Sequence, residues 1–192
     1  MVFSLSLGAT LAYSLSTYKW GGTSVNYYIN STFALSFRTA MQSADSAWDN
    51  AGSKFKFNYA GITNRNPNVW ATNHDGYSDI GHYNFGNTGN MIAGSDMNIT
   101  NGTTTITETD TTFNTYYSFT TVGANGMYDV QNTMTHEFGH WLKLLDLSSG
   151  FPPSWCGWEI ESTMCGTLWT GETRKRSLEG DDKDGIKAKY GI

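Results

Sequence analysis

Residues 24–59 carry the pattern that most constrains the fold, a strand, a helix and a second strand in succession. In "SVNYYIN", the apolar residues alternate with polar ones through Tyr27 and Ile29, as on one face of a strand. Apolar residues then recur at three- and four-residue steps from Phe37 to Trp48, which predicts an amphipathic helix. "KFKFNY" alternates again. Two strands joined by a helical crossover run parallel, so the pattern predicts an α/β fold with a parallel sheet.

The middle of the chain, residues 61–125, is rich in Gly, Asn, Asp and Thr. Such residues favour turns, so we expect short strands joined by long loops there. The strand candidates are "DIGHYNF", "NMIAGSDM" and "TTTITETD". The chain of 192 residues shows no repeat and no low-complexity linker, and this length suits one well-cored domain. We therefore expect a single domain over residues 1–192.

Composition excludes several classes of function. The net charge of -5 and the pI near 5.2 come without a basic stripe, which argues against a nucleic-acid partner. No apolar run approaches the roughly 20 residues of a membrane span. The fraction of charged residues is low at 15%, the fraction of aromatic residues is high at 15%, and small polar residues are abundant. Such a composition is typical of an exported protein. We expect a secreted monomer.

The two cysteines, Cys156 and Cys165, lie nine positions apart in "CGWEIESTMC". In an oxidising compartment this pair would form a disulfide that closes a small loop. The alternative is two free, buried thiols. We expect the disulfide, which is consistent with export.

The segment "YDVQNTMTHEFGHWLKLL" carries the chemistry. An apolar stripe from Val130 through Phe138 to Leu145 predicts a helix, and Asp129 is a suitable N-cap. His136 and His140 lie four residues apart, so both imidazoles project from one face and can reach a single ion. Glu137 stands beside them. This H-E-x-x-H arrangement indicates two metal ligands and a general base.

A catalytic zinc usually takes three protein ligands and leaves the fourth position to water. Asp146, six residues after His140, can reach the metal if the chain turns back at the end of the helix. Glu159 and Glu161 are competing candidates, at the distance along the chain that another zinc-peptidase clan uses. We expect Asp146 to be the third ligand. Downstream, "ESTMCG" places Met164 among small residues.

Together, the H-E-x-x-H helix, a ligand six residues later and the S-x-M segment resemble the metzincin clan of zinc metallopeptidases. The resemblance is closest to matrixin-like enzymes, and an aspartate as third ligand is similar to the snapalysin branch. It implies a twisted, mainly parallel sheet, with the active-site helix and a C-terminal helix below a long cleft. It also implies that Met164 lies in a Met-turn that forms an apolar floor beneath the metal ligands.

Besides Asp146, which replaces the commoner histidine, two positions depart from the clan pattern. Lys143 stands where the clan has a glycine at a sharp turn, often with positive φ. A non-glycine residue there costs on the order of 1 kcal/mol. Gly166 stands where some members have a tyrosine that stabilises the oxyanion.

The resemblance implies a secreted endopeptidase that acts on extended proteins or peptides with a zinc-activated water and Glu137 as general base. Substrate would pair with a strand edge near Ile92 and Ala93. One alternative is a metal-stabilised binding or adhesion module that kept the helix but lost activity through Lys143. Another is a structural domain in which His136 and His140 only form hydrogen bonds in a polar core. No motif specifies calcium: Glu108 and Asp110 are candidate ligands, but a solvated strand edge explains them equally well. We likewise interpret "NHDGYSDIGHYNFG", which holds the remaining two histidines, as an ordinary polar loop.

Overall fold

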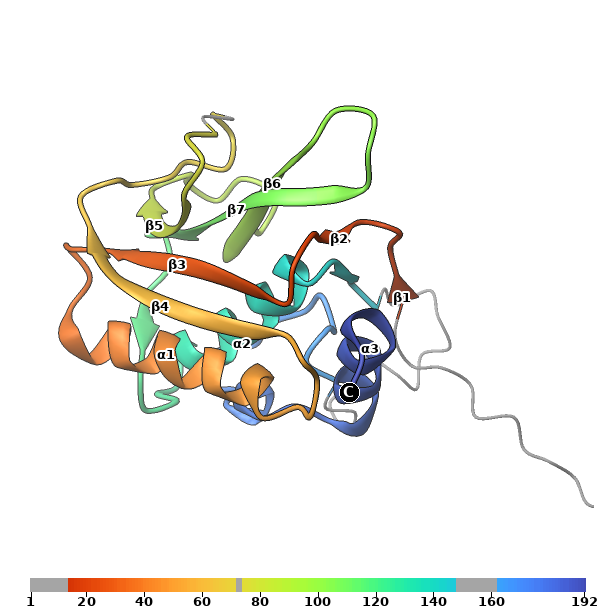
Figure 1. Cartoon of the computed structure of the whole chain (residues 1–192). Coiled ribbons are helices and arrows are strands. Elements are labelled where there is room, and N and C mark those ends of the chain that lie inside the picture. Colours follow the sequence, from red (N-terminus) through yellow and green to blue (C-terminus); the bar gives the residue numbers. More distant parts are fainter. Residues whose placement is uncertain (1–13, 72–73, 148–161) are drawn as a thin grey trace, which may run out of the picture.

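The computed structural model describes residues 14–71, 74–147 and 162–192, and it has a mixed α/β architecture (Figure 1). The helices are α1 (Leu35–Asp49), α2 (Val130–Trp141) and α3 (Gly180–Tyr190), with one short 3-10 helix, η1 (Arg174–Arg176). The strands of the main sheet are β2 (Lys19–Trp20), β3 (Ser24–Asn30), β4 (Lys56–Thr63), β5 (Ser78–Tyr83), β6 (Ala93–Ile99) and β7 (Thr105–Asn114). The remaining strands are β1 (Ser14–Leu15), β8 (Phe119–Thr120), β9 (Tyr128–Asp129) and β10 (Leu144–Leu145).

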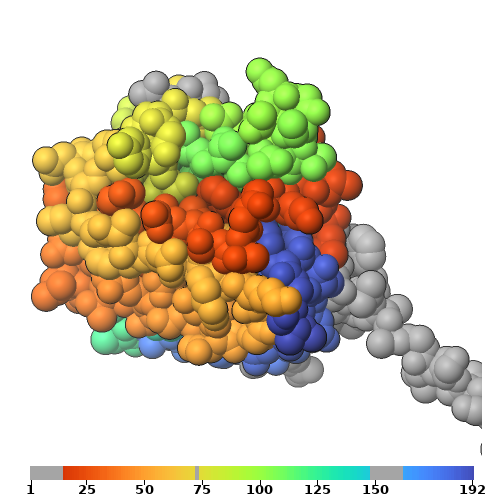
Figure 2. Space-filling model, viewed as in Figure 1, coloured from red at the N-terminus to blue at the C-terminus, as the bar shows by residue number. Residues whose placement is uncertain are grey.

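The main sheet is mostly parallel, as the sequence predicts. Strands β4, β3, β5 and β7 pair in parallel in this order, and β2 pairs in parallel with the start of β7. Strand β6 is antiparallel to β7 and lies at the edge. The β6–β7 hairpin projects from the body of the protein (Figure 2). Within the described residues β7 is the one strand that pairs with β6, so the second edge of β6 is open.

The three helices gather on one side of this sheet (Figure 1). Helix α1 buries the apolar stripe that the sequence predicts, including Met41 and Trp48. Between α2 and the sheet, the ring of Phe138 contacts those of Tyr27 and Phe57 at centroid distances of 5.3 and 4.4 Å. This aromatic layer fixes the distance from α2 to the sheet.

Helix α2 lies deep in the molecule. Asp129 caps its N-terminus by accepting a hydrogen bond from the backbone N–H of Asn132, as predicted. The indole of Trp48 donates to the carbonyl of Thr135 at 2.8 Å, and that of Trp20 donates to the carbonyl of Trp141 at 2.8 Å. These two bonds anchor the helix to α1 and to β2.

The predicted apolar stripe is wrong at its last residue. The helix ends at Trp141, and Leu145 belongs to β10, where it is 39% exposed. The chain turns before Leu145 because Lys143 adopts φ +57, a left-handed conformation that no helix continues. None of the helices in the described residues is long and apolar enough to cross a membrane.

Candidate metal centre

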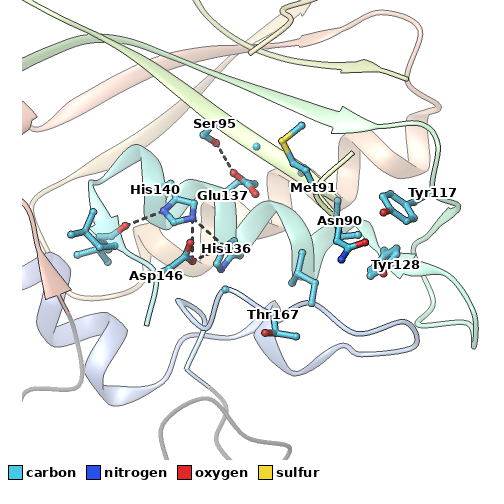
Figure 3. Close-up of a pocket in the computed structure, with 18 of the residues that line it drawn as sticks. Asn90, Met91, Ser95, Tyr117, Tyr128, His136, Glu137, His140, Asp146 and Thr167 are labelled. Carbon is cyan, nitrogen blue, oxygen red and sulfur yellow. Dashed lines mark hydrogen bonds and ion pairs between the residues drawn. The ribbon is translucent and has the colours of Figure 1, made fainter. Parts of the chain in front are cut away.

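His136 and His140 lie one turn apart on α2, and their rings face a common point (Figure 3). The two Nε2 atoms are 3.1 Å apart. His136 is buried, whereas His140 is partly open to solvent. The four-residue spacing produces this arrangement, because side chains at i and i+4 lie above each other on a helix.

Asp146 reaches the same point from outside the helix. The backbone turns back at Lys143, whose N–H donates to the carbonyl of His140 at 2.8 Å. Strand β10 then pairs with β1, and the N–H of Leu147 donates to the carbonyl of Met164 at 2.8 Å. Held on both sides in this way, the Oδ1 atom of Asp146 lies 3.4 Å from the Nε2 atoms of both histidines.

These three atoms fit one tetrahedral cation. Zinc bonds imidazole nitrogen and carboxylate oxygen at about 2.0–2.2 Å, so the ligand atoms of a tetrahedral site are about 3.3–3.5 Å apart. The two separations of 3.4 Å from Asp146 lie in that range, and the 3.1 Å between the two Nε2 atoms is slightly shorter. Asp146 retains a half-exposed side chain, so a fourth position would face solvent.

Hydrogen bonds assign the tautomers of both rings. The Nδ1 atom of His136 lies 2.7 Å from the carbonyl of Thr163, and that of His140 lies 3.0 Å from the carbonyl of Leu144. A carbonyl only accepts, so each Nδ1 carries the proton and each Nε2 presents a lone pair to the other ligands. Such partners orient metal-binding histidines in general.

The charges at this point favour a cation. Burial, followed by the charge of His140, lowers the pKa of His136 and keeps that ring neutral. Burial also opposes protonation of His140, but Asp146 and Glu137 together outweigh it and raise its pKa. Burial opposes ionisation of Asp146, but the two neighbouring histidines outweigh it and lower the pKa of this carboxyl. Two facing lone pairs beside a carboxylate therefore attract one positive charge.

The segment around Met164 supports the histidines from below. Met164 is buried and packs against Gly139, where an added Cβ would lie 3.1 Å from its Cε atom. The backbone N–H of Thr163, the residue before Met164, donates a hydrogen bond to the carboxylate of Asp182 on α3 at 3.1 Å. The carbonyl of Thr163 also accepts the hydrogen bond from Nδ1 of His136, so α3 positions one of the predicted ligands through Thr163.

Glu137 lies beside the three predicted ligands and is only 3% exposed. Its Oε2 atom accepts a hydrogen bond from the hydroxyl of Ser95 on β6 at 2.6 Å (Figure 3). Burial raises the pKa of Glu137, although His140 and the bond from Ser95 act in the opposite direction. The carboxylate is thus held between the helix and the edge strand.

A cleft of about 770 Å³ opens over these groups. Strand β6 forms one wall, residues 166–168 form part of the other, and Tyr117 and Tyr128 line it as well. Ile92 and Ala93, the predicted substrate-binding residues, both line the cleft. The carbonyl of Ile92 accepts a hydrogen bond from the backbone N–H of Asn114, the last residue of β7, and is therefore not available to a substrate. Backbone groups alternate along a strand, so Ala93 and Ser95 present theirs to the open edge.

The first part of the predicted polar loop, residues 74–77, folds against β7, whereas residues 78–83 of the same segment form β5. The Nδ1 atom of His74 lies 3.6 Å from Oε1 of Glu108, and these residues and Asp110 offer ligand atoms within 4.8 Å of one another. The solvated strand edge, one of the two explanations of Glu108 and Asp110, is wrong, because these residues are only 1% and 9% exposed. Both Glu108 oxygens accept backbone N–H groups, from Asp75 and Gly76, so its burial needs no cation.

Three predicted residues, Cys156, Glu159 and Glu161, lie outside the described residues. The disulfide with Cys165 therefore stays a prediction, as does the competition between the glutamates and Asp146. Sequence reasoning missed Ser95 and Asp182. The first had a detectable signal, because it lies two residues after Ala93 and so shares its strand face.

No family model matches the chain, and no curated protein matches its sequence. Among solved structures, it is similar to high choriolytic enzyme 1, a hatching enzyme zinc-protease from the medaka fish Oryzias latipes. The similarity covers 91% of this chain and 94% of that chain, with a TM-score of 0.48 and 12% sequence identity. The inference about function therefore rests on the geometry of the site.

Proposed function

We propose that this protein is a zinc-dependent endopeptidase of the metzincin type. One observation carries the proposal: Nε2 of His136, Nε2 of His140 and Oδ1 of Asp146 converge within 3.1–3.4 Å of one another, beside the buried carboxylate of Glu137. A metal-binding triad alone would not specify hydrolysis. A buried base next to the triad, facing a long cleft, supports it.

In this proposal, His136, His140 and Asp146 hold zinc and leave one coordination position open. When bound, zinc would polarise the scissile carbonyl and make a water molecule more acidic. The aspartate adds a negative charge to the centre, so the metal would be a weaker Lewis acid than with three neutral imidazoles. This ligand set is the basis on which we propose similarity to the snapalysin branch.

Glu137 acts as the general base. It takes a proton from the attacking water and delivers it to the leaving amine, a role that needs an ionised carboxylate of raised basicity. Its burial supplies that basicity, because desolvation raises its pKa. Its place next to His136 in the helix keeps it within reach of the open coordination position.

The substrate is an extended segment of a protein or peptide. The open edge of β6 offers backbone groups of Ala93 and Ser95, and strand addition binds without strict sequence preference. Ile92 contributes to the cleft wall, while its carbonyl stays in the sheet. The composition and the cysteine pair support an extracellular location.

A non-catalytic adhesion module is the weaker candidate. It requires that Lys143 disrupt the site, yet this residue makes the left-handed turn with φ +57 and Asp146 arrives at the two histidines. The cost of about 1 kcal/mol for that backbone conformation falls on stability rather than on the position of the ligands.

The test combines metal analysis with proteolysis. We expect one zinc per chain by mass spectrometry, and cleavage of unfolded casein that a zinc chelator abolishes and added zinc restores. Glu137→Ala should keep zinc and lose nearly all cleavage. The control is Glu172→Gln, which should keep both, because Glu172 does not line the cleft and accepts a hydrogen bond from the N–H of Trp169. Zinc-loaded Glu137→Ala protein with undiminished cleavage would refute the mechanism.

A further inference from the structure

A chain of three hydrogen bonds runs from the core to the carboxylate of Glu137. The indole N–H of Trp141 donates to Oγ1 of Thr111 at 2.7 Å. Oγ1 of Thr111 lies 2.7 Å from Oγ of Ser95, which donates to Oε2 of Glu137 at 2.6 Å. Thr111 and Trp141 are fully buried, so water does not compete for the bond between them, whereas Ser95 lies at the cleft wall.

The direction of every bond in this chain is determined. An indole N–H can only donate, and each hydroxyl has a single proton. The hydroxyl of Ser95 donates its hydrogen bond to Glu137, so it must accept the hydrogen bond from the hydroxyl of Thr111. Thr111 in turn accepts a hydrogen bond from the indole N–H of Trp141. The hydroxyl of Ser95 is therefore oriented before any substrate arrives.

This orientation makes the two oxygens of Glu137 unequal. Oε2 is bound by Ser95, whereas no hydrogen bond within the described part of the chain occupies Oε1. A glutamate side chain has three rotatable bonds, and a strong bond to an ionised acceptor removes much of that freedom. General-base catalysis depends on such placement, since it is worth about 10²–10⁴-fold in rate.

We propose that Ser95 is a positioning residue for the general base: its hydroxyl, oriented by Thr111 and Trp141, holds Oε2 of Glu137 and leaves Oε1 to take the proton. This inference rests on the proposed peptidase function. Ser95 acts through Glu137, and its hydroxyl faces the carboxylate rather than the predicted metal ligands (Figure 3).

The kinetic test uses a peptide cut by the wild-type protein, with zinc content measured for every variant. Ser95→Ala should lower kcat roughly tenfold to hundredfold, while KM stays within about twofold and zinc remains stoichiometric. Ser95→Thr keeps the hydroxyl and should restore most of kcat. An unchanged kcat, a change in KM alone, or loss of zinc would each overturn the positioning role.

A matched pair on β7 tests the hydrogen-bond chain. Thr111→Val removes the hydroxyl that orients Ser95 and should lower kcat several-fold. Thr112→Val removes an equally buried hydroxyl that bonds to the carbonyl of Pro67, away from the cleft, and should leave kcat unchanged. Equal effects of the two variants on kcat would contradict the chain.

A second measurement does not depend on activity. In metal-free protein, a double-mutant cycle of Ser95→Ala and Glu137→Ala should give a coupling of roughly tenfold in the unfolding equilibrium constant. Additive effects would show that the bond contributes nothing and would overturn the inference. A zinc-loaded wild-type protein that cleaves no peptide would instead refute the proposed function, and the cycle would still decide whether Ser95 holds Glu137.

Discussion

Replacing Gly139 by alanine should destabilise the protein, although the same change usually stabilises a helix. An added Cβ would overlap Sδ of Met164 and would lie 3.1 Å from both Cε of Met164 and Cζ2 of Trp48. Trp48 is fully buried and anchored by its bond to Thr135, so it cannot move away. Met164, 1% exposed, must therefore leave its place under the site.

The expected magnitude follows from two opposing contributions. Alanine in a helix interior gains about 0.5–1 kcal/mol over glycine. An extra methyl group in a packed core costs about 1–3 kcal/mol. The overlap with Sδ places Gly139→Ala near the upper end of that cost, so we expect a net loss of about 2–2.5 kcal/mol in the free energy of unfolding.

Urea unfolding of the metal-free protein measures this loss as a lower midpoint with an unchanged slope. The double variant Gly139→Ala/Met164→Ala is the control, because it removes Sδ and Cε of Met164 and leaves only the 3.1 Å contact with Cζ2 of Trp48. Adding Gly139→Ala to Met164→Ala should then cost little or stabilise the protein. The packing argument is refuted if Gly139→Ala alone is as stable as the wild type.

Three further predictions concern the site and its surroundings. In Gly166→Ala, the new Cβ would lie 3.0 Å from Cγ of Asp146. Its zinc affinity, measured in competition with a chelator, should therefore fall about tenfold or more. Asp146→Ala removes a predicted ligand and should lose zinc on dialysis. Lys143→Gly relieves the positive φ and should stabilise the protein by up to about 1 kcal/mol, and a lower melting temperature would contradict this. Burial raises the pKa of Asp45, which accepts a hydrogen bond from Tyr27, to about 6. The folded state therefore binds the proton more tightly, and Asp45 should contribute a fall in stability of up to about 3 kcal/mol as pH rises from about 4 to 6. Asp45→Asn should remove this part of the slope and leave the parts due to Asp110 and Asp182, whose pKa values burial also raises.

Much of the fold follows from local patterns in the sequence. The alternation around Tyr27 and the helical spacing up to Trp48 predicted a parallel strand pair with a helical crossover, which the structure confirms. Element ends were less accurate, as Leu145 shows, because a helix ends where tertiary contacts favour another conformation. The interpretation of Glu108 as a solvent-exposed residue was wrong for a similar reason, because the loop around Asp75, 33 residues away in the sequence, covers it.

The sequence alone determined that two imidazoles share one face of α2. Residues four apart share a helix face whatever surrounds the helix, so His136 and His140 needed no tertiary information. Only the tertiary structure decided what meets them. Asp146 arrives through the pairing of β10 with β1, and Ser95 arrives through the register of β6 on β7. Contacts between distant segments depend on the packing of the whole chain, and no local periodicity encodes that packing.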